Sequence, residues 1–234
     1  MRFENLLLEE IMQELNQSVV KFNNINSIYL NNNIERHHDD NVIGNIHDDT
    51  YNYTSGSKDI NKSLWDIKKG SDSSNRLLNN INNINTNLND CSPAKDDLIV
   101  YSGVRRDPQK VVKETGGLLH HPAFISTSVN PSNALNFSCD REDTGIRHVL
   151  KIKVRKGQQV GGYLGNKSSY DNENEYLLKA NQMLHIHPHY EDFTDAKGKT
   201  LRVHNAIILE PHEYNHLSSH DEVKSIHRLN DILH

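Results

Sequence analysis

Tyr170-Asp-Asn-Glu173-Asn-Glu175-Tyr-Leu-Leu-Lys179 places two glutamates one residue apart, directly before an apolar run. Side chains alternate between the faces of an extended strand, so residues two apart point the same way. Glu173 and Glu175 are therefore predicted to project side by side into one cleft. Most such pairs are solvated surface, but close carboxylates are also used to act on positive charge. The pair gains weight only together with other motifs.

A second motif lies upstream, in Phe124-Ile-Ser126-Thr127-Ser128. Its apolar and hydroxyl residues predict a short strand that leads into a helix over residues 131–137. Asn130 can cap that helix, and Pro131 suits its first turn. The hydroxyl groups of Ser126, Thr127 and Ser128 are thereby expected at the end of a strand, although strand hydroxyls before a helix cap are also common without a function.

A third motif opens the C-terminal part of the chain. Leu98-Ile-Val-Tyr-Ser-Gly103 is typical of a buried strand, and Arg105 and Arg106 follow it. The three motifs therefore follow one another in a fixed order: basic residues after a strand, then Ser-Thr-Ser, then Glu-x-Glu. In this order of motifs the chain resembles the R-S-E class of mono-ADP-ribosyltransferases. This class includes arginine-modifying bacterial toxins and the Alt-type enzymes of bacteriophages. The resemblance covers roughly Asp96 to Glu210.

The resemblance implies a fold and a reaction. The fold is an α+β, ADP-ribosyltransferase-type split β-sandwich with few helices. The reaction is transfer of ADP-ribose from NAD, the co-substrate, to an arginine side chain of a target protein, with release of nicotinamide. Its transition state carries positive charge at the ribose ring, as in glycoside hydrolysis, so a fixed carboxylate stabilises it.

The resemblance also assigns roles to single residues. Glu175 matches the catalytic glutamate, which hydrogen-bonds the ribose 2′-hydroxyl, and Glu173 matches the glutamate that accompanies an arginine acceptor. A guanidinium stays protonated at neutral pH, so it needs a carboxylate to orient it and accept its proton. Ser126 matches the serine that orients the catalytic glutamate and holds the nicotinamide side of NAD, with Thr127 and Ser128 supporting the strand.

Two aromatic residues are assigned more loosely. Tyr170, three residues before Glu173, matches an aromatic that contacts the target protein, and an aromatic face suits a guanidinium. Tyr170 would otherwise be an ordinary loop residue. Phe137 can wall the nicotinamide pocket, but a helix residue of this kind is more often packed into the core.

The chain departs from the family at one position. The family usually has Tyr-Arg-Gly on its first strand, whereas this chain has Tyr101-Ser102-Gly103. Arg105 or Arg106 is expected to supply the cation that grips the NAD diphosphate, with Arg105 favoured because it is nearer the strand. Two other functions stay open: an NAD glycohydrolase on the same fold, in which water replaces the acceptor, and an inactive NAD- or protein-binding module.

Composition narrows the partners. The chain has 234 residues, a net charge of -5 and two cysteines outside any metal-binding spacing. It has no strongly basic field, so nucleic acid is not expected as a partner, and no apolar run of membrane-spanning length. The first residues lack the apolar region of a secretory signal. We expect action in a host cytoplasm after injection or carriage in a virion, with host RNA polymerase as the candidate target by analogy alone.

The amino-acid composition and the spacing of apolar residues change near residue 95. Residues 1–95 are predicted to be a helical, Asn-rich and partly disordered region, and 96–234 the catalytic domain. Within the first region, helices are predicted over 3–22, 60–69 and 77–88, and a loop or disordered linker over 23–59. The second region alternates short strands with two helices, which predicts a mostly antiparallel, two-sheet core.

Fifteen histidines raise the question of a metal. The densest groups are His120-His121 and His185-Ile-His187-Pro-His189. No nearby cysteine or carboxylate completes a zinc-like set around either group, so no metal is expected.

Overall fold

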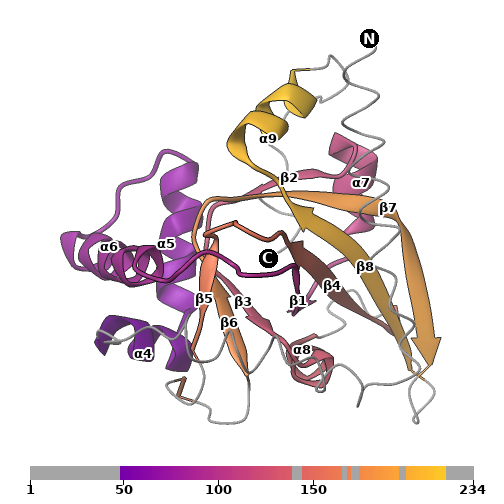
Figure 1. Cartoon of the computed structure of the whole chain (residues 1–234), viewed down its shortest axis with the longest axis horizontal. Coiled ribbons are helices and arrows are strands. Elements are labelled where there is room, and N and C mark those ends of the chain that lie inside the picture. The colour runs from indigo at the N-terminus through magenta and orange to yellow at the C-terminus, as the bar shows by residue number, and fades with distance from the viewer. Residues whose placement is uncertain (1–47, 139–143, 165–167, 170–173, 195–198, 220–234) are drawn as a thin grey trace.

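The computed structural model describes residues 48–138, 144–164, 168–169, 174–194 and 199–219, which form an α+β structure (Figure 1). The described helices are α4 (Asp48–Ser55), α5 (Lys58–Lys68), α6 (Asn75–Asn89), α7 (Gln109–Thr115), α8 (Pro131–Phe137) and α9 (Pro211–Ser218). The described strands are β1 (Leu98–Val104), β2 (Leu118–His121), β3 (Ile125–Ser128), β4 (Ile146–Val154), β5 (Gly161–Tyr163), β6 (Glu175–Leu178), β7 (Gln182–Thr194) and β8 (Thr200–Ile208). The helix predicted over 3–22 lies outside these residues.

The eight strands form one mixed sheet in the order β2-β7-β8-β4-β1-β3-β6-β5. The expectation of a mostly antiparallel sheet is confirmed, since only β4 and β8 pair in parallel. The join between β1 and β3 is narrow. They share the single residue pair Tyr101–Ser128, whereas β1 and β4 pair along the whole of Leu98–Val104. The sheet therefore has a five-stranded part, β2-β7-β8-β4-β1, and a three-stranded part, β3-β6-β5.

The central core joins these two parts. Val100, Ile152 and Ile186 of the five-stranded part lie in one buried cluster with Tyr176 and Leu178 of the three-stranded part. Alternation along each strand sends the neighbouring residues to the other face. The split β-sandwich that the sequence predicted is thus confirmed, with the two layers continuous through one residue pair.

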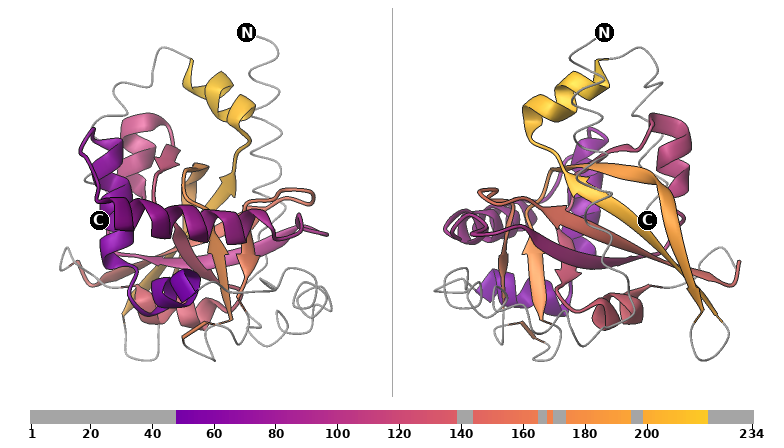
Figure 2. Two further views of the ribbon diagram at one scale, coloured as in Figure 1. Left: turned by 90° about the vertical axis from the view of Figure 1, so that its left-hand side faces the viewer. Right: turned by 45° about the vertical axis from the view of Figure 1, so that its right-hand side comes forward.

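Helices cover the remaining faces. Helices α4, α5 and α6 lie against the three-stranded part, as the two further views in Figure 2 show. Their buried residues Tyr53, Trp65 and Ile84 share a cluster with Phe124 and Leu177 of the sheet side. The predicted division at residue 95 remains a prediction, but these described residues of the N-terminal region pack on the sheet.

Helix α8 packs on β1 at a glycine. A Cβ on Gly103 would lie 2.2 Å from the carbonyl oxygen of Ala134, which is closer than atoms can approach. Glycine at this position therefore lets the helix backbone lie directly on the strand. The start of α8 is as predicted, because the Asn130 side chain accepts a hydrogen bond from the Ser132 backbone N–H and Pro131 occupies the first turn.

Four elements differ from the prediction. The loop expected over 23–59 is wrong for Asp48–Ser55, which forms α4. The polar sequence of this segment gives no helical pattern, because the contacts that stabilise α4 are made with other parts of the chain. Thr50 and Tyr53 are fully buried, and Asn87 of α6 donates a hydrogen bond to the Thr50 hydroxyl at 2.9 Å. Strand β2 and helix α9 were not predicted. The β7 strand also continues past Pro188 to Thr194 through an irregularity between Ile186 and Tyr190.

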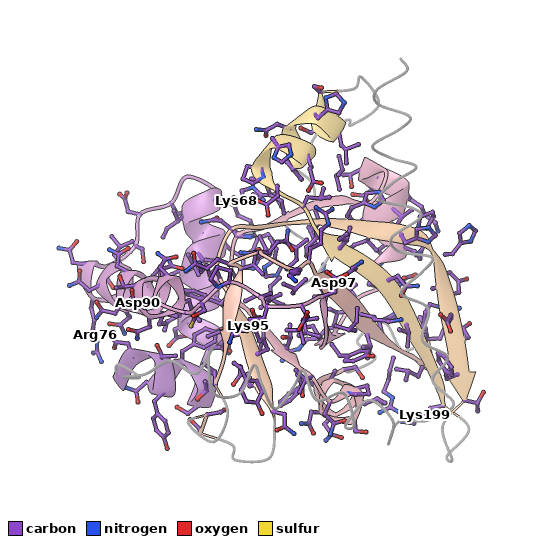
Figure 3. The ribbon with its side chains drawn as sticks, in the orientation of Figure 1. Lys68, Arg76, Asp90, Lys95, Asp97 and Lys199 are labelled. Atoms are coloured by element: carbon purple, nitrogen blue, oxygen red, sulfur yellow. The ribbon has the colours of Figure 1, made fainter. Side chains whose placement is uncertain are left out.

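An ion pair anchors the start of β1. Asp97, labelled in Figure 3, lies 3.1 Å from the Lys153 ammonium group of β4 and accepts the backbone N–H of Lys156 at 2.9 Å. Burial raises the pKa of Asp97, but the Lys156 N–H and the charges of Lys153 and Arg155 together outweigh it and hold this pKa below its usual value. Among the described helices, none is both long enough and apolar enough to cross a membrane.

Candidate active site

Glu175 is the first residue of β6 and is almost completely buried, with 4% of its surface exposed. The Ser168 hydroxyl donates to its Oε2 at 3.0 Å, and Ser168 is itself buried. Glu175 pairs with Ser128 across the β3–β6 ladder, and Ser126 pairs with Leu177. Paired residues share a face of the sheet, so Ser126, Ser128 and Glu175 all lie on one face.

The residue before Glu175 has an unusual backbone. Asn174 has a φ of 46°, in the left-handed region that favours glycine and asparagine. Its backbone carbonyl accepts the Val129 N–H at 3.2 Å, and its side-chain oxygen accepts the Tyr163 hydroxyl at 2.9 Å. The extended geometry assumed from Glu173 to Glu175 is therefore wrong at Asn174. Glu173 and Tyr170 lie outside the described residues.

The hydroxyl groups of β3 hold this turn. Ser128 Oγ lies 3.3 Å from the Asn174 carbonyl, to which it donates, and accepts the Asn130 backbone N–H at 2.9 Å. The Thr127 hydroxyl donates to the carbonyl of Tyr176 in β6. These bonds connect the start of α8, the end of β3 and the start of β6, and so fix the position of the Glu175 carboxylate.

A cavity of about 310 Å³ opens beside Glu175, at the narrow join of the sheet. Serine and threonine hydroxyls line it together with apolar side chains such as Leu119, Leu150 and Leu184. Of the predicted site residues it brings together Arg105, Ser126, Thr127, Ser128, Phe137 and Glu175. Among the described lining residues, Glu175 is the only carboxylate and Arg105 the only arginine or lysine.

The two arginines after β1 differ in position. Arg105 lines the cavity and is exposed, whereas Arg106 is half-buried and is not among the lining residues. Ser102, which stands where the family usually has arginine, lines the cavity too. Its hydroxyl donates to the Ser126 carbonyl at 3.0 Å and thereby ties β1 to β3 beside their single residue pair.

Phe137 lies at the end of α8 with 55% of its surface exposed, and it lines the cavity. The alternative that it packs into the core is therefore wrong. An exposed phenyl ring at the mouth of a cavity is available to stack on a planar group.

Sequence reasoning missed the contribution of the N-terminal helices. Thr54, Ser57 and Asn61 of the α4–α5 region line the cavity. Behind them, the hydroxyl of fully buried Tyr53 exchanges hydrogen bonds with the Asn61 amide at 3.0 and 3.3 Å. Burial raises the pKa of Tyr53, and the nearby Glu175 charge raises it further. No pattern marked these residues, because helical spacing predicts that a helix packs and not which pocket it borders.

Helix α4 also holds the segment that leads to Glu175. The Thr54 hydroxyl lies 2.7 Å from that of Ser169 and accepts the Ser169 backbone N–H at 3.0 Å. Ser169 in turn donates to the carbonyl of Tyr51 at 3.0 Å. Ser168, which donates to Glu175, is therefore positioned from residues more than a hundred positions earlier in the chain.

Comparison with known proteins agrees with this geometry. The model of the ADP-ribosyltransferase exoenzyme family matches residues 45–211, which is most of the chain. The chain belongs to this family. It is thus an ADP-ribosyltransferase of the toxin-like class, a transferase that uses NAD as its co-substrate. No match was found among the curated proteins.

Solved structures of such enzymes share the fold. The Clostridium limosum C3 exoenzyme superposes with a TM-score of 0.60 at 16% identity, over 82% of this chain and 98% of that one. Plx2a, an ADP-ribosyltransferase toxin from Paenibacillus larvae, superposes with a TM-score of 0.55 at 21% sequence identity. The match covers 69% of this chain and 84% of Plx2a. The ADP-ribosylating toxin BECa of Clostridium perfringens, solved with NADH, superposes with a TM-score of 0.52 at 22% sequence identity. The match covers 69% of this chain and 42% of BECa.

Proposed function

We propose that this enzyme transfers ADP-ribose from NAD to arginine side chains of a target protein and releases nicotinamide. The observation that carries the proposal is the cavity whose wall includes Glu175, Ser126 and Arg105. Family membership supports the transferase chemistry, and the Glu-x-Glu sequence supports the choice of arginine.

Glu175 acts on the ribose of NAD. As the bond between ribose C1′ and the nicotinamide nitrogen breaks, its electron pair leaves with neutral nicotinamide and positive charge develops on the ribose ring. A buried carboxylate held by Ser168 is already oriented toward such charge, so little reorganisation is needed during the reaction. Ser126 and Phe137 are proposed to hold the nicotinamide end.

The acceptor arginine is served by Glu173. A guanidinium nitrogen forms the new bond to C1′, and Glu173 accepts the proton that this nitrogen loses. Tyr170 is proposed to contact the target protein beside the acceptor, where its ring can stack on the guanidinium. The basis for both roles is the resemblance of the Glu-x-Glu sequence and its preceding aromatic to arginine-modifying relatives.

Arg105 is proposed to bind the diphosphate of NAD. The diphosphate carries two negative charges, and a guanidinium binds phosphate oxygens through paired hydrogen bonds. Arg105 makes no salt bridge with another described residue, so its charge is available to a ligand. Ser102 and Thr127, also in the lining, are proposed to contribute hydroxyl contacts.

The target is proposed to be a protein of a host cell, reached by injection or by carriage in a virion. Host RNA polymerase is the candidate acceptor by analogy with the phage Alt-type enzymes. Two alternatives remain: an NAD glycohydrolase on the same fold, in which water replaces the acceptor, and an inactive NAD- or protein-binding module, motivated by Ser102 in place of the usual arginine.

The test is an assay of NAD turnover with defined acceptors. The full chain is incubated with NAD labelled in the adenylate part, with polyarginine, polyasparagine or no acceptor, and with host lysate. Label on polyarginine and on arginine residues of a lysate protein, located by mass spectrometry, is the expected result. Free ADP-ribose without transfer would instead identify a glycohydrolase, and absence of NAD turnover would identify a binding module.

A further inference from the structure

Three potential metal ligands meet outside the cavity that contains Glu175. Asp107 follows β1, His148 lies on β4, and His204 lies on β8. His204 is fully buried, His148 is 5% exposed, and the Asp107 side chain is 25% exposed. Both histidines point to the side of the sheet that carries Leu150 and Ala206, at the edge of the central core. None of these three residues belongs to the two histidine-rich segments of the sequence, His120-His121 and residues 185–189.

The distances fit one small ion. His148 Nδ1 lies 3.0 Å from His204 Nε2, and Asp107 Oδ1 lies 3.8 and 3.9 Å from these same two atoms. The point equidistant from the three corners of this triangle lies about 2.1 Å from each of them, which matches Zn–N and Zn–O bond lengths. An ion at that point lies in the plane of the three ligand atoms, and small side-chain movements would bring it out of this plane toward tetrahedral geometry.

The ligand chemistry favours a first-row transition metal. Two imidazoles and one carboxylate suit zinc and its neighbours, whereas calcium and magnesium prefer oxygen ligands throughout. Three protein ligands leave a fourth, tetrahedral position for water. The Asp107 side chain is 25% exposed, so the group of three residues borders solvent on that side.

The surroundings can orient the ligands. The second ring nitrogen of His204, Nδ1, faces the Gln109 side-chain amide at 3.3 Å. The same amide nitrogen donates to the His187 carbonyl at 3.4 Å, so Gln109 holds the His204 ring through the nitrogen that does not face His148. Asp107 Oδ1 also accepts the Gln109 backbone N–H at 2.9 Å, and a carboxylate oxygen can accept this bond and ligate at the same time.

We propose that Asp107, His148 and His204 bind one zinc-type divalent transition metal ion, with water as the fourth ligand. The ion ties the segment after β1 to strands β4 and β8. Because Asp107 is two residues beyond Arg105, the bound ion restrains the segment that carries this arginine.

The direct test uses the full chain without a histidine tag, stripped of metal by a chelator and titrated with Co²⁺. The wild type is expected to bind one Co²⁺ per chain with the visible spectrum of a tetrahedral site, and Zn²⁺ should displace it. Asp107→Asn and His204→Gln should each bind at least tenfold more weakly. His212→Asn, in an exposed position of α9, should bind as the wild type does.

Two results would overturn the site. One is failure of the wild type to bind Co²⁺ or Zn²⁺ at micromolar concentration, which would identify the histidines as a hydrogen-bonded pair. The other is unchanged affinity in both Asp107→Asn and His204→Gln, which would assign the metal to other histidines. Near-ultraviolet circular dichroism establishes that Asp107→Asn, the smaller perturbation, retains the native fold.

The restraint on Arg105 has its own readout, and it rests on the proposed NAD-binding function. Removal of the metal should weaken NAD binding several-fold in the wild type and leave that of Asp107→Asn unchanged. If the metal binds with the predicted ligands but NAD affinity does not respond to it, the restraint is wrong and the metal site stands. If neither protein binds NAD at all, the proposed function fails independently of the metal titration.

Discussion

In the three-stranded part of the sheet, the face turned away from the central core carries Ser126, Ser128 and Glu175, whereas the same face of the five-stranded part carries Val149, Leu201 and Val203. The face with Glu175 borders the cavity. The face with Val149, Leu201 and Val203 packs in one buried cluster with Ala134 of helix α8. The longer strands of the five-stranded part provide the extended ladders, and the short strands β3 and β6 hold the serines and the glutamate at the cavity.

The difference has a structural cause. A polar group can remain buried only if its hydrogen bonds are satisfied. The short strands β3 and β6 end where a left-handed residue and a helix start supply such partners, as at Asn174 and Asn130. In the interiors of β4 and β8, backbone groups bond to one another, and the buried polar side chains there, such as His148 and His204, bond to each other instead of to loop or helix ends. The cavity that contains Glu175 is therefore located at the join of the two parts.

The largest effect is expected from removal of helices α4, α5 and α6, which cover the three-stranded part of the sheet. Residues 96–234 alone would expose Phe124, Leu164 and Leu177, which pack against α4, α5 and α6 in the full chain. We expect this fragment to lose cooperative thermal unfolding and NAD turnover, because the exposed cluster is too large to leave in water. Cooperative unfolding and normal turnover of the fragment would instead establish residue 95 as the boundary of an independent catalytic domain.

The next largest effect is expected from Glu175→Gln, which keeps the shape of the side chain and removes its charge. Loss of one electrostatic contact to a developing cation typically costs on the order of a hundredfold in rate. Both transfer and NAD hydrolysis should fall by at least that factor, measured as nicotinamide release. Glu114→Gln, on the exposed side of α7, is the matched control. Near-normal turnover by Glu175→Gln would contradict the assignment.

Glu173→Gln separates the two glutamates. Since Glu173 is proposed to serve the acceptor and not the ribose, this variant should lose transfer to polyarginine and keep appreciable NAD hydrolysis. Both products are measured in one reaction, as label on acceptor and as free ADP-ribose. An equal fall of both activities, to the level of Glu175→Gln, would mean that the division of roles is wrong.

The two arginines after β1 form a matched pair for a smaller effect. Arg105→Ala should raise the Michaelis constant for NAD about tenfold, because loss of a charged hydrogen bond to phosphate costs roughly 1.5 to 3 kcal/mol. Arg106→Ala should change it little, since Arg106 is not part of the cavity lining. An effect of Arg106→Ala alone would reverse the assignment, and no effect of either would place the diphosphate elsewhere.

The smallest effect concerns two tyrosines of α4. Tyr53→Phe removes a buried hydroxyl that bonds to Asn61, and we expect a loss of about 1 kcal/mol in the free energy of unfolding. Tyr51→Phe, at a position 50% exposed, should change this free energy little. Denaturant titration measures both. Equal stability of the two variants would show that the Tyr53–Asn61 contact does not stabilise the cover of the cavity.

Local sequence determined the elements whose signals are complete within a few residues. The Asn130-Pro131 pair specified the start of α8, and the apolar runs at Leu98 and Tyr176 specified β1 and β6, because caps and alternation act through neighbouring backbone groups. The order of the motifs also predicted the family, and all but one of the described residues that it marked as a site line the cavity, the exception being Arg106.

The tertiary structure alone decided which distant groups meet. Helical spacing in α5 and α6 says that one face is apolar, but not that α4 and α5 place Thr54 and Asn61 at the cavity of Glu175. The meeting of His148 with His204 depends on the register of the parallel β4–β8 pair. Such registers follow from the packing of whole strands across long loops, to which each residue contributes only a small part of the free energy.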